Sequence, residues 1–234
     1  MRRRLTIGEE RWPETPEFSA VAARWNRNAS TIMLGFVWRG YERFCADLLC
    51  KIDVALADEQ LERSITQFLT PRIRGCMTSF EPFDIEQGVY EFETRLAASA
   101  QPPLYDLAFV LTSNPRIMWP LEAKVLRTEG GVGQYAKEVS ENFLTCRYAP
   151  FSAEGAMIGY LVAGDPVNVF ANIEMKVCCT LEHHPDFPNH NHKTSFHERS
   201  VPAGKRYPAS FRCHHLIMPL KQQQPCCRES VGRT

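Results

Sequence analysis

Apolar residues occupy every second position along two short stretches in the middle of the chain. The stretches run from Tyr105 to Leu111 and from Ile117 to Leu126, and this alternation is the spacing of a half-buried β-strand. The residues between them, 112–116, form a segment of the length typical of a hairpin loop. The pattern therefore predicts an antiparallel β-hairpin over residues 105–126.

The register of this hairpin decides which polar side chains face one another. The numbers of opposed residues in an antiparallel pair have a constant sum, so Leu111 opposite Ile117 places Asp106 opposite Glu122. Side chains alternate between the two faces of a sheet, which puts Asp106, Glu122 and Lys124 on one face. The other face is apolar and carries Tyr105, Leu107, Phe109, Leu111, Ile117, Trp119, Leu121, Ala123 and Val125.

Two acids in directly opposed positions lie about 5 Å apart and repel one another. A divalent cation between them would remove that repulsion, since Mg²⁺ prefers oxygen ligands. Lys124 points the same way as Glu122 and could orient an attacking water or hold a phosphate oxygen. Two acids and a lysine on one face are the groups that metal-assisted hydrolysis of a phosphodiester requires.

These residues resemble the PD-(D/E)xK nuclease superfamily. Asp106 corresponds to the lone acid and Glu122-Ala123-Lys124 to the acid-x-lysine, while Tyr105 stands where the family's pattern has a proline. The resemblance implies that Asp106 and Glu122 ligate Mg²⁺, with Mn²⁺ as a substitute and the carbonyl of Ala123 as a candidate third ligand. It also implies that Lys124 positions the nucleophilic water.

The same acid-x-lysine pattern occurs a second time, at Glu174-Met175-Lys176. Asp165-Pro166 upstream is typical of a helix start, and Val169, Ile173 and Val177 then follow helical spacing. Residues two apart on a helix do not face each other, so Glu174 and Lys176 should diverge. For the hairpin, two other interpretations stay open: solvated charges on an exposed sheet face, and a former nuclease site that now only binds.

The rest of the chain predicts an alternation of helices and strands. In order, we expect an irregular arm to about Asn28, a helix over 34–52, a helix with Asp58 as its N-cap that stops near Pro71, a strand over 89–95, the hairpin, a helix from 133 through 143, a strand over 154–162, a helix over 166–178 and a strand over 211–218.

This order gives a fold class and a division of the chain. A helix, three strands, a helix and a strand form an α/β sandwich, and the order matches the αβββαβ core that the resemblance implies. We therefore expect a restriction-endonuclease-like core at residues 58–220, with a central mixed sheet flanked by helices. An N-terminal arm and helix at 1–57 and a flexible tail at 221–234 complete the division.

Other residues are secondary candidates for the site. Members of the superfamily often carry a further glutamate on the first core helix, and Glu62 is the candidate here. Glu59 and Glu93 are the other candidates for this role. The alternative is that Glu62 is an ordinary solvated charge on a helix. Gln134 resembles a glutamine that lies beside the catalytic lysine in several branches. Lys137 is a candidate for nucleic-acid binding, or a solvated helix lysine. The glycines at 130–133 leave free amides or form a flexible turn, and they lack the ending of a P-loop.

All seven histidines of the chain lie between residues 183 and 215. Their spacing fits no standard zinc finger, although zinc is bound by nitrogen and sulfur ligands and Cys178, Cys179 and Cys213 lie nearby. Pro185, Pro188 and a weak apolar periodicity predict a long polar surface loop over 182–200. We expect one histidine of this loop to contact nucleic acid, with a structural zinc clip as the alternative.

Charge and composition limit the setting. Lys and Arg together number 27, as do Asp and Glu, so the chain has no broad basic sheath for nucleic acid, and any contact surface must be local or supplied by a partner or by oligomerisation. No apolar segment follows the basic start, and no apolar run is long enough to cross a bilayer. We expect a cytoplasmic protein whose nine scattered cysteines stay reduced.

The functional expectation is a Mg²⁺-dependent endonuclease that acts on DNA, in a bacterial restriction or anti-phage defence system. It would act as a homo-oligomer or with a partner protein of a defence complex, and without contact to a membrane. Two alternatives remain: a DNA-repair or RNA-processing nuclease with the same chemistry, and a catalytically silent subunit that keeps the fold and binds a partner protein.

Overall fold

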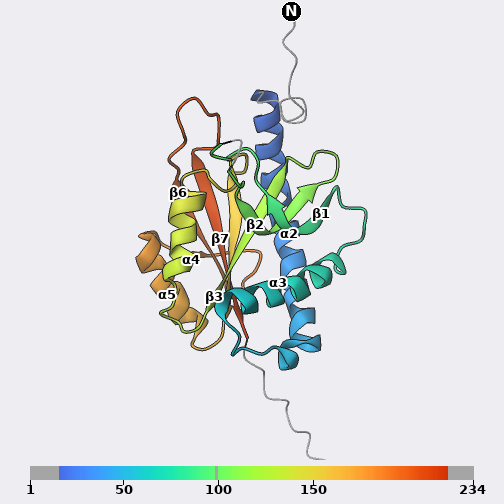
Figure 1. Cartoon of the computed structure of the whole chain (residues 1–234), viewed down its shortest axis with the longest axis vertical. Helices are drawn as coiled ribbons and strands as arrows, with labels where there is room; N and C mark the ends of the chain where they lie inside the picture. Colours follow the sequence, from blue (N-terminus) through green and yellow to red (C-terminus); the bar gives the residue numbers. More distant parts are fainter. Residues whose placement is uncertain (1–15, 98–99, 221–234) are drawn as a thin grey trace, which may run out of the picture.

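In the described part of the chain, a mixed sheet of seven strands lies between two helices on one face and two on the other (Figure 1). The structure, a computed structural model, describes the backbone of residues 16–97 and 100–220, and the side chains of these residues from Ala29 on. The expected α/β class is confirmed. The expected arm over 1–15 and the tail over 221–234 lie outside the described residues.

The helices are α2 (Pro16–Asp47), α3 (Asp58–Arg74), α4 (Gly133–Glu138), which continues into a π-helical turn (Val139–Phe143), and α5 (Pro166–Val177). The strands are β1 (Phe83–Tyr90), β2 (Leu104–Leu111), β3 (Met118–Leu126), β4 (Glu154–Leu161), β5 (Glu182–His183), β6 (His192–Glu198) and β7 (Ser210–Pro219). Across the sheet they follow the order β1-β2-β3-β4-β7-β6-β5.

Strands β2 and β3 form the predicted hairpin in the predicted register. Leu107 lies opposite Leu121, which is the last pair of the ladder. In this register the next two residues, Asp106 and Glu122, lie across from each other directly beyond the paired segment. On its other side β3 runs parallel to β4, and β4 runs parallel to β7. The acid-bearing hairpin therefore lies inside the sheet and not at an edge of the sheet.

Each face of the sheet has its own hydrophobic core. Helices α2 and α3 cover the middle of the predicted apolar stripe, from Leu107 and Phe109 to Trp119, Leu121 and Ala123, whereas Leu111 and Ile117 form a small separate cluster with Phe151. The opposite face, which carries the acids, is covered as well, because α4 and α5 pack over Ala108, Val110 and Leu126. Tyr105 lies in this second core instead of beside Leu107, since its hydroxyl donates to Glu91 at 2.9 Å.

The two N-terminal helices extend further than the sequence pattern indicates. Helix α2 begins at Pro16, so the residues expected to form an irregular arm up to Asn28 are helical from that point. Proline suits a first helical position because its missing amide hydrogen has no partner there. Helix α3 takes its N-cap at Ala57 and continues through Pro71 to Arg74, because Ile73 beyond the proline is fully buried.

Strand β1 was expected over residues 89–95 and lies instead at 83–90. The inward positions of β1 are Phe83 and Ile85, both buried, and they alternate with acids. The alternation ends after Ile85, since Gln87 is exposed, and the backbone of Gly88 has a φ of 66°. Directly after the strand, the buried carboxylate of Glu91 accepts hydrogen bonds from the Glu93 amide and the Tyr105 hydroxyl.

Nine of the nineteen residues expected to form a long histidine-rich loop, 182–183 and 192–198, belong to the sheet. β6 pairs along its whole length with β7, and β5 pairs with β6. For β6 the prediction was wrong because the side chains that this strand buries are polar, namely His192, Thr194 and Ser195. Buried polar residues that bond one another leave no apolar periodicity in the sequence.

Pro120 is accommodated inside an inner strand. It lies opposite Ala108 in the β2–β3 pair, and the β3–β4 pairing begins one residue later, at Leu121. The carbonyl of Glu154 at the start of β4 accepts a hydrogen bond from the Ser152 hydroxyl at 2.5 Å. The amide that a proline lacks is therefore not required by the ladder at this point.

The seven cysteines in the described part of the chain are all free thiols. None of the helices within the described residues combines the length and the apolar character that a membrane crossing requires.

Candidate active site

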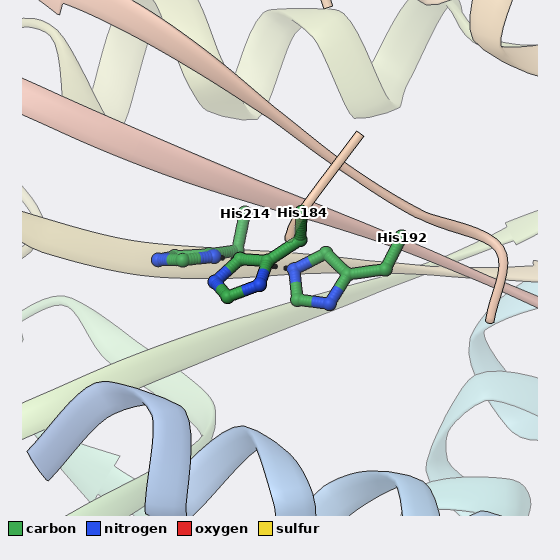
Figure 2. A group of neighbouring side chains, drawn as sticks. All are labelled: His184, His192 and His214. Carbon is green, nitrogen blue, oxygen red and sulfur yellow. Dashed lines mark hydrogen bonds between the residues drawn. The ribbon is translucent and has the colours of Figure 1, made fainter. Parts of the chain in front are cut away.

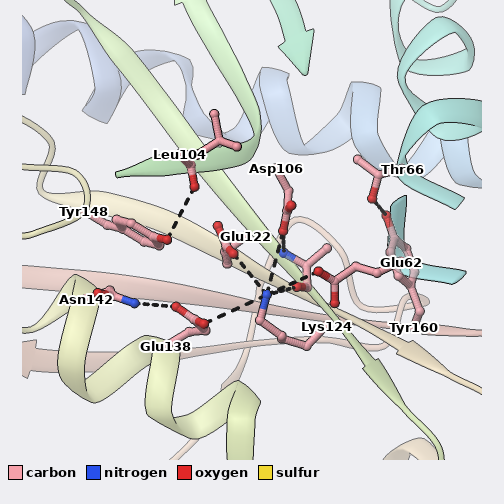
Figure 3. Close-up of polar contacts among 11 residues, drawn as sticks. Glu62, Thr66, Leu104, Asp106, Glu122, Lys124, Glu138, Asn142, Tyr148 and Tyr160 are labelled. Carbon is pink, nitrogen blue, oxygen red and sulfur yellow. Dashed lines mark hydrogen bonds and ion pairs between the residues drawn. The ribbon is translucent and has the colours of Figure 1, made fainter. Parts of the chain in front are cut away.

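Lys124 on β3 lies among four carboxylates that come from four different elements (Figure 3). Its Nζ is 3.0 Å from Glu122 on the same strand and 3.9 Å from Asp106 on β2. Glu62 on α3 approaches to 3.4 Å and Glu138 on α4 to 3.9 Å. The hairpin and the helices of both layers therefore converge on one ammonium group.

The backbone of Ala123 joins this cluster from the centre of β3. Lys124 Nζ donates to the Ala123 carbonyl at 2.6 Å, and the Ala123 amide donates to Asp106 Oδ2 at 2.8 Å. The ammonium thus lies within 3.9 Å of an oxygen of each residue that the sequence predicts as a metal ligand. A positive charge is held between Asp106, Glu122 and the Ala123 carbonyl.

The charges of the cluster are largely withdrawn from solvent. The side chain of Glu122 is 6% exposed and that of Lys124 is 18% exposed. Glu122 Oε2 is buried and has no hydrogen-bond partner among the described residues. These burials disagree with the interpretation of the hairpin acids as solvated charges on an open sheet face.

Burial and mutual repulsion change the ionisation of these groups. Burial raises the pKa of Glu122 well above its usual value, and the charges of Asp106 and Glu138 add to that effect while Lys124 opposes it. Burial likewise raises the pKa of Glu62 to about 7. For Lys124, burial alone would lower the pKa, but the nearby carboxylates outweigh it and the pKa is raised.

Some secondary candidates join the cluster and others do not. Glu62 is part of it, whereas Glu59 is exposed on α3 and Glu93 bonds Arg116 at 2.6 Å in a separate polar group. Gln134 is exposed at the start of α4 and lies outside the contacts of Lys124. Lys137 is also exposed and pairs with Glu141 at 3.7 Å on the outer face of the helix.

Sequence reasoning missed Glu138 and Tyr148. Glu138 is four residues after Gln134, which puts both on one side of the helix, but this spacing does not show that the side faces Lys124. The Glu138 carboxylate also accepts a hydrogen bond from Asn142 in the π-helical turn. Tyr148 lies in the following loop and has no sequence signal; its hydroxyl donates to the Leu104 carbonyl at 3.4 Å, beside the cluster (Figure 3).

The phenol of Tyr148 is kept neutral. Burial raises its pKa, and the charges of Glu122, Glu138 and Asp106 raise it further. A neutral hydroxyl next to several carboxylates is a hydrogen-bond donor, so Tyr148 adds polarity to the cluster without adding charge.

The second acid-x-lysine lies on a helix, as predicted. Asp165 caps α5 by accepting from the Val167 amide at 2.9 Å, with Pro166 as the first residue of the helix. Glu174 bonds the Leu181 amide at 3.4 Å, and Lys176 is exposed. These two residues therefore provide a matched control for Glu122 and Lys124.

The chain matches no protein-family model, and neither the curated proteins nor the solved structures include a significant match. A functional assignment therefore depends on the geometry of the cluster.

Proposed function

We propose that this protein is a metal-dependent endonuclease that hydrolyses DNA phosphodiester bonds, with Asp106, Glu122 and Lys124 as its central groups. The observation that carries the proposal is the Lys124 ammonium between the acids of two opposed strands, 3.0 Å from one and 3.9 Å from the other. The order α3-β1-β2-β3-α4-β4, with β3 parallel to β4, supports a restriction-endonuclease-like core.

The residues around the ammonium fit a hard divalent cation. Asp106, Glu122 and the Ala123 carbonyl supply only oxygen atoms, which Mg²⁺ and Mn²⁺ prefer. Glu122 Oε2 is a buried acceptor without a hydrogen-bond partner among the described residues, so this oxygen is available to ligate a cation. Because Lys124 holds the position between these oxygens, cation binding requires its Nζ to move aside.

Each residue then has a separate task. A bound Mg²⁺ supplies charge neutralisation for the phosphate and a water of lowered pKa. The Ala123 amide fixes the rotamer of Asp106 through the 2.8 Å bond. Lys124, displaced from the acids, orients the water or holds a phosphate oxygen. Glu62, with a pKa of about 7, can hold or release a proton near neutral pH.

The wider setting is part of the same proposal. A bacterial restriction or anti-phage defence system is the setting that we propose, with DNA as substrate and Mg²⁺ as cofactor. The chain has equal numbers of basic and acidic residues, so affinity for DNA must come from a local surface or from a second copy. A homo-oligomer would bring together the two active sites that a double-strand break needs.

Conversion of supercoiled plasmid to nicked and linear forms tests the proposal. We expect cleavage with Mg²⁺ or Mn²⁺ and none in EDTA. Asp106→Asn and Glu122→Gln should each lower the rate by at least about 100-fold, since even the outer partners of metal ligands are worth 10- to 100-fold. DNA binding without cleavage by the wild-type protein would indicate a silent nuclease fold, and preferential cleavage of RNA would indicate an RNA-processing enzyme.

A further inference from the structure

Three buried histidines meet on the face of the sheet that α2 covers (Figure 2). His184 directly follows β5, His192 begins β6 and His214 lies in β7. One ring nitrogen of each lies within 4.8 Å of the others, and no other such group of three His, Cys, Asp or Glu occurs among the described residues. Their exposed fractions are 4%, 0% and 0%.

All three rings are almost fully withdrawn from solvent. Burial lowers the pKa of His192, and the neighbouring His214 and His184 lower it further. Burial also lowers the pKa values of His184 and His214. Burial at this site thus disfavours the charged imidazolium, and neutral imidazole is the histidine form that ligates metals.

The spacing of two of the rings fits a tetrahedral ion. His192 Nε2 is 3.2 Å from His214 Nδ1. Zn–N bonds of about 2.0–2.1 Å in tetrahedral geometry set ligand nitrogens about 3.3 Å apart. The position and ring spacing of these histidines are thus compatible with one shared ion.

The surroundings of His214 add a second, independent observation. Its Nε2 is 3.7 Å from Glu154 Oε2, and both atoms are buried without a hydrogen-bond partner among the described residues. Arg212 holds the other oxygen of Glu154 at 3.2 Å. A carboxylate that faces the far nitrogen of a histidine directs the proton to that nitrogen and leaves Nδ1 free for a metal.

We propose that His184, His192 and His214 bind one transition-metal ion, zinc in the first instance, and that the ion ties the β5–β6 segment to β7. Imidazole ligands select Zn²⁺, Cu²⁺ or Ni²⁺ over Mg²⁺, so this site differs in chemistry from the oxygen ligands around Lys124. It shares no residue with them, and the proposal is independent of the proposed nuclease function. Because the site is buried, its expected effect is on stability.

Two hydrogen bonds to these rings would be lost on metal binding, and the loss of the bond from Trp38 can be measured. The Trp38 indole donates to His192 Nδ1 at 3.3 Å, and the Asp186 amide donates to His184 Nδ1 at 3.2 Å. In the metal-free protein the protons of these two rings therefore lie on Nε2. A metal at Nε2 moves each proton to Nδ1, so every ring stays neutral and Trp38 loses its acceptor.

Zinc content after gel filtration, measured by elemental analysis, tests the site. We expect one zinc per chain in the wild-type protein and a several-fold lower content in His184→Gln. His183→Gln is the matched control, because His183 is adjacent and exposed, and it should retain zinc. Glu122→Gln should also retain zinc, which separates this site from the oxygen cluster. A wild-type chain without bound zinc after incubation with Zn²⁺, or equal zinc in His184→Gln, would overturn the proposal.

The melting temperature and the tryptophan emission give two further tests, and neither depends on whether one particular variant folds. EDTA should lower the melting temperature of the wild-type protein and of His183→Gln, but not that of His184→Gln. Zinc titration should change the tryptophan emission, and Trp38→Phe should reduce that change while binding zinc at least as tightly, because no indole bond is lost. Zinc binding that leaves the emission unchanged, or that Trp38→Phe weakens, would contradict the geometry.

Discussion

Lys124 is a partly buried lysine in a strongly acidic environment. Its ammonium lies within 4 Å of four carboxylates, two of which, on Glu62 and Glu122, have raised pKa values. A cluster of this kind carries excess negative charge even with the ammonium in place. That excess disfavours the metal-free protein and favours the binding of a divalent cation.

The excess charge leads to a prediction for the stability of Glu122→Gln. In EDTA, this variant should be as stable as the wild-type protein or more stable, because it removes one of several repelling carboxylates and Lys124 keeps three others. Thermal melting in EDTA measures the effect. A clear fall in melting temperature would mean that Glu122 is mainly a structural partner of Lys124.

A second residue-scale prediction concerns Glu91, which lies outside both sites. Burial raises its pKa from 4.5 to about 7, although hydrogen bonds from the Glu93 amide and the Tyr105 hydroxyl oppose the rise. The folded chain therefore binds more protons than the unfolded chain between pH 4.5 and 7. The free energy of unfolding should fall as pH rises through this window, and Glu91 contributes about 3 kcal/mol to that fall.

Glu91→Gln isolates this contribution. Urea unfolding should be measured at several pH values from 5 to 8. The free energy of unfolding of Glu91→Gln, relative to that of the wild-type protein, should rise with pH by on the order of 3 kcal/mol across the full window. Other raised acids, such as Glu62, act in both proteins and cancel in the difference. A difference that does not change with pH would show that Glu91 titrates normally in the folded protein.

At the scale of elements, the hairpin was the most predictable part of the fold. Strict alternation over residues 105–126 sets the register of β2 and β3, and the register sets Asp106 against Glu122. β6 could not be predicted in the same way, because the side chains that it buries are polar and hydrogen-bonded. Ser195, for example, bonds both His197 and His215 at 2.6 and 2.8 Å.

The crossing of α2 and α3 gives the element-scale prediction. A Cβ on Gly40 would lie 2.9 Å from the backbone of Ile73 and 2.5 Å from its side chain, so Gly40→Ala should push α3 away. The expected loss is about 1–3 kcal/mol in urea unfolding. Gly35→Ala is the control in the same helix, because its Cβ would meet only the end of Arg39 at 3.3 Å.

In Gly35→Ala, better helix propensity should give unchanged or higher stability, by up to about 1 kcal/mol. α3 also carries Glu62, so Gly40→Ala should loosen the Lys124 cluster while leaving its residues unchanged. Equal stability of the two variants would mean that the helices do not cross as closely as described.

At the scale of the whole molecule, the sheet brings together residues that lie far apart in the sequence. Glu62 comes from α3 in one helical layer and Glu138 from α4 in the other, and the carboxylates of both lie within 4 Å of Lys124 Nζ. The sequence predicted the acids on the hairpin because their spacing is local. It could not single out Glu138, or the meeting of His184 with His214, because these contacts depend on how whole layers pack.

The most direct test of the central claim compares Lys124→Ala with Lys176→Ala in plasmid cleavage with Mg²⁺. Both variants remove a lysine from an acid-x-lysine sequence, but only Lys124 lies between Asp106 and Glu122. The account predicts that Lys124→Ala lowers the cleavage rate by about 10²–10⁴-fold and that Lys176→Ala cleaves at the wild-type rate. Wild-type cleavage by a folded Lys124→Ala protein, or loss of cleavage in Lys176→Ala, would contradict it.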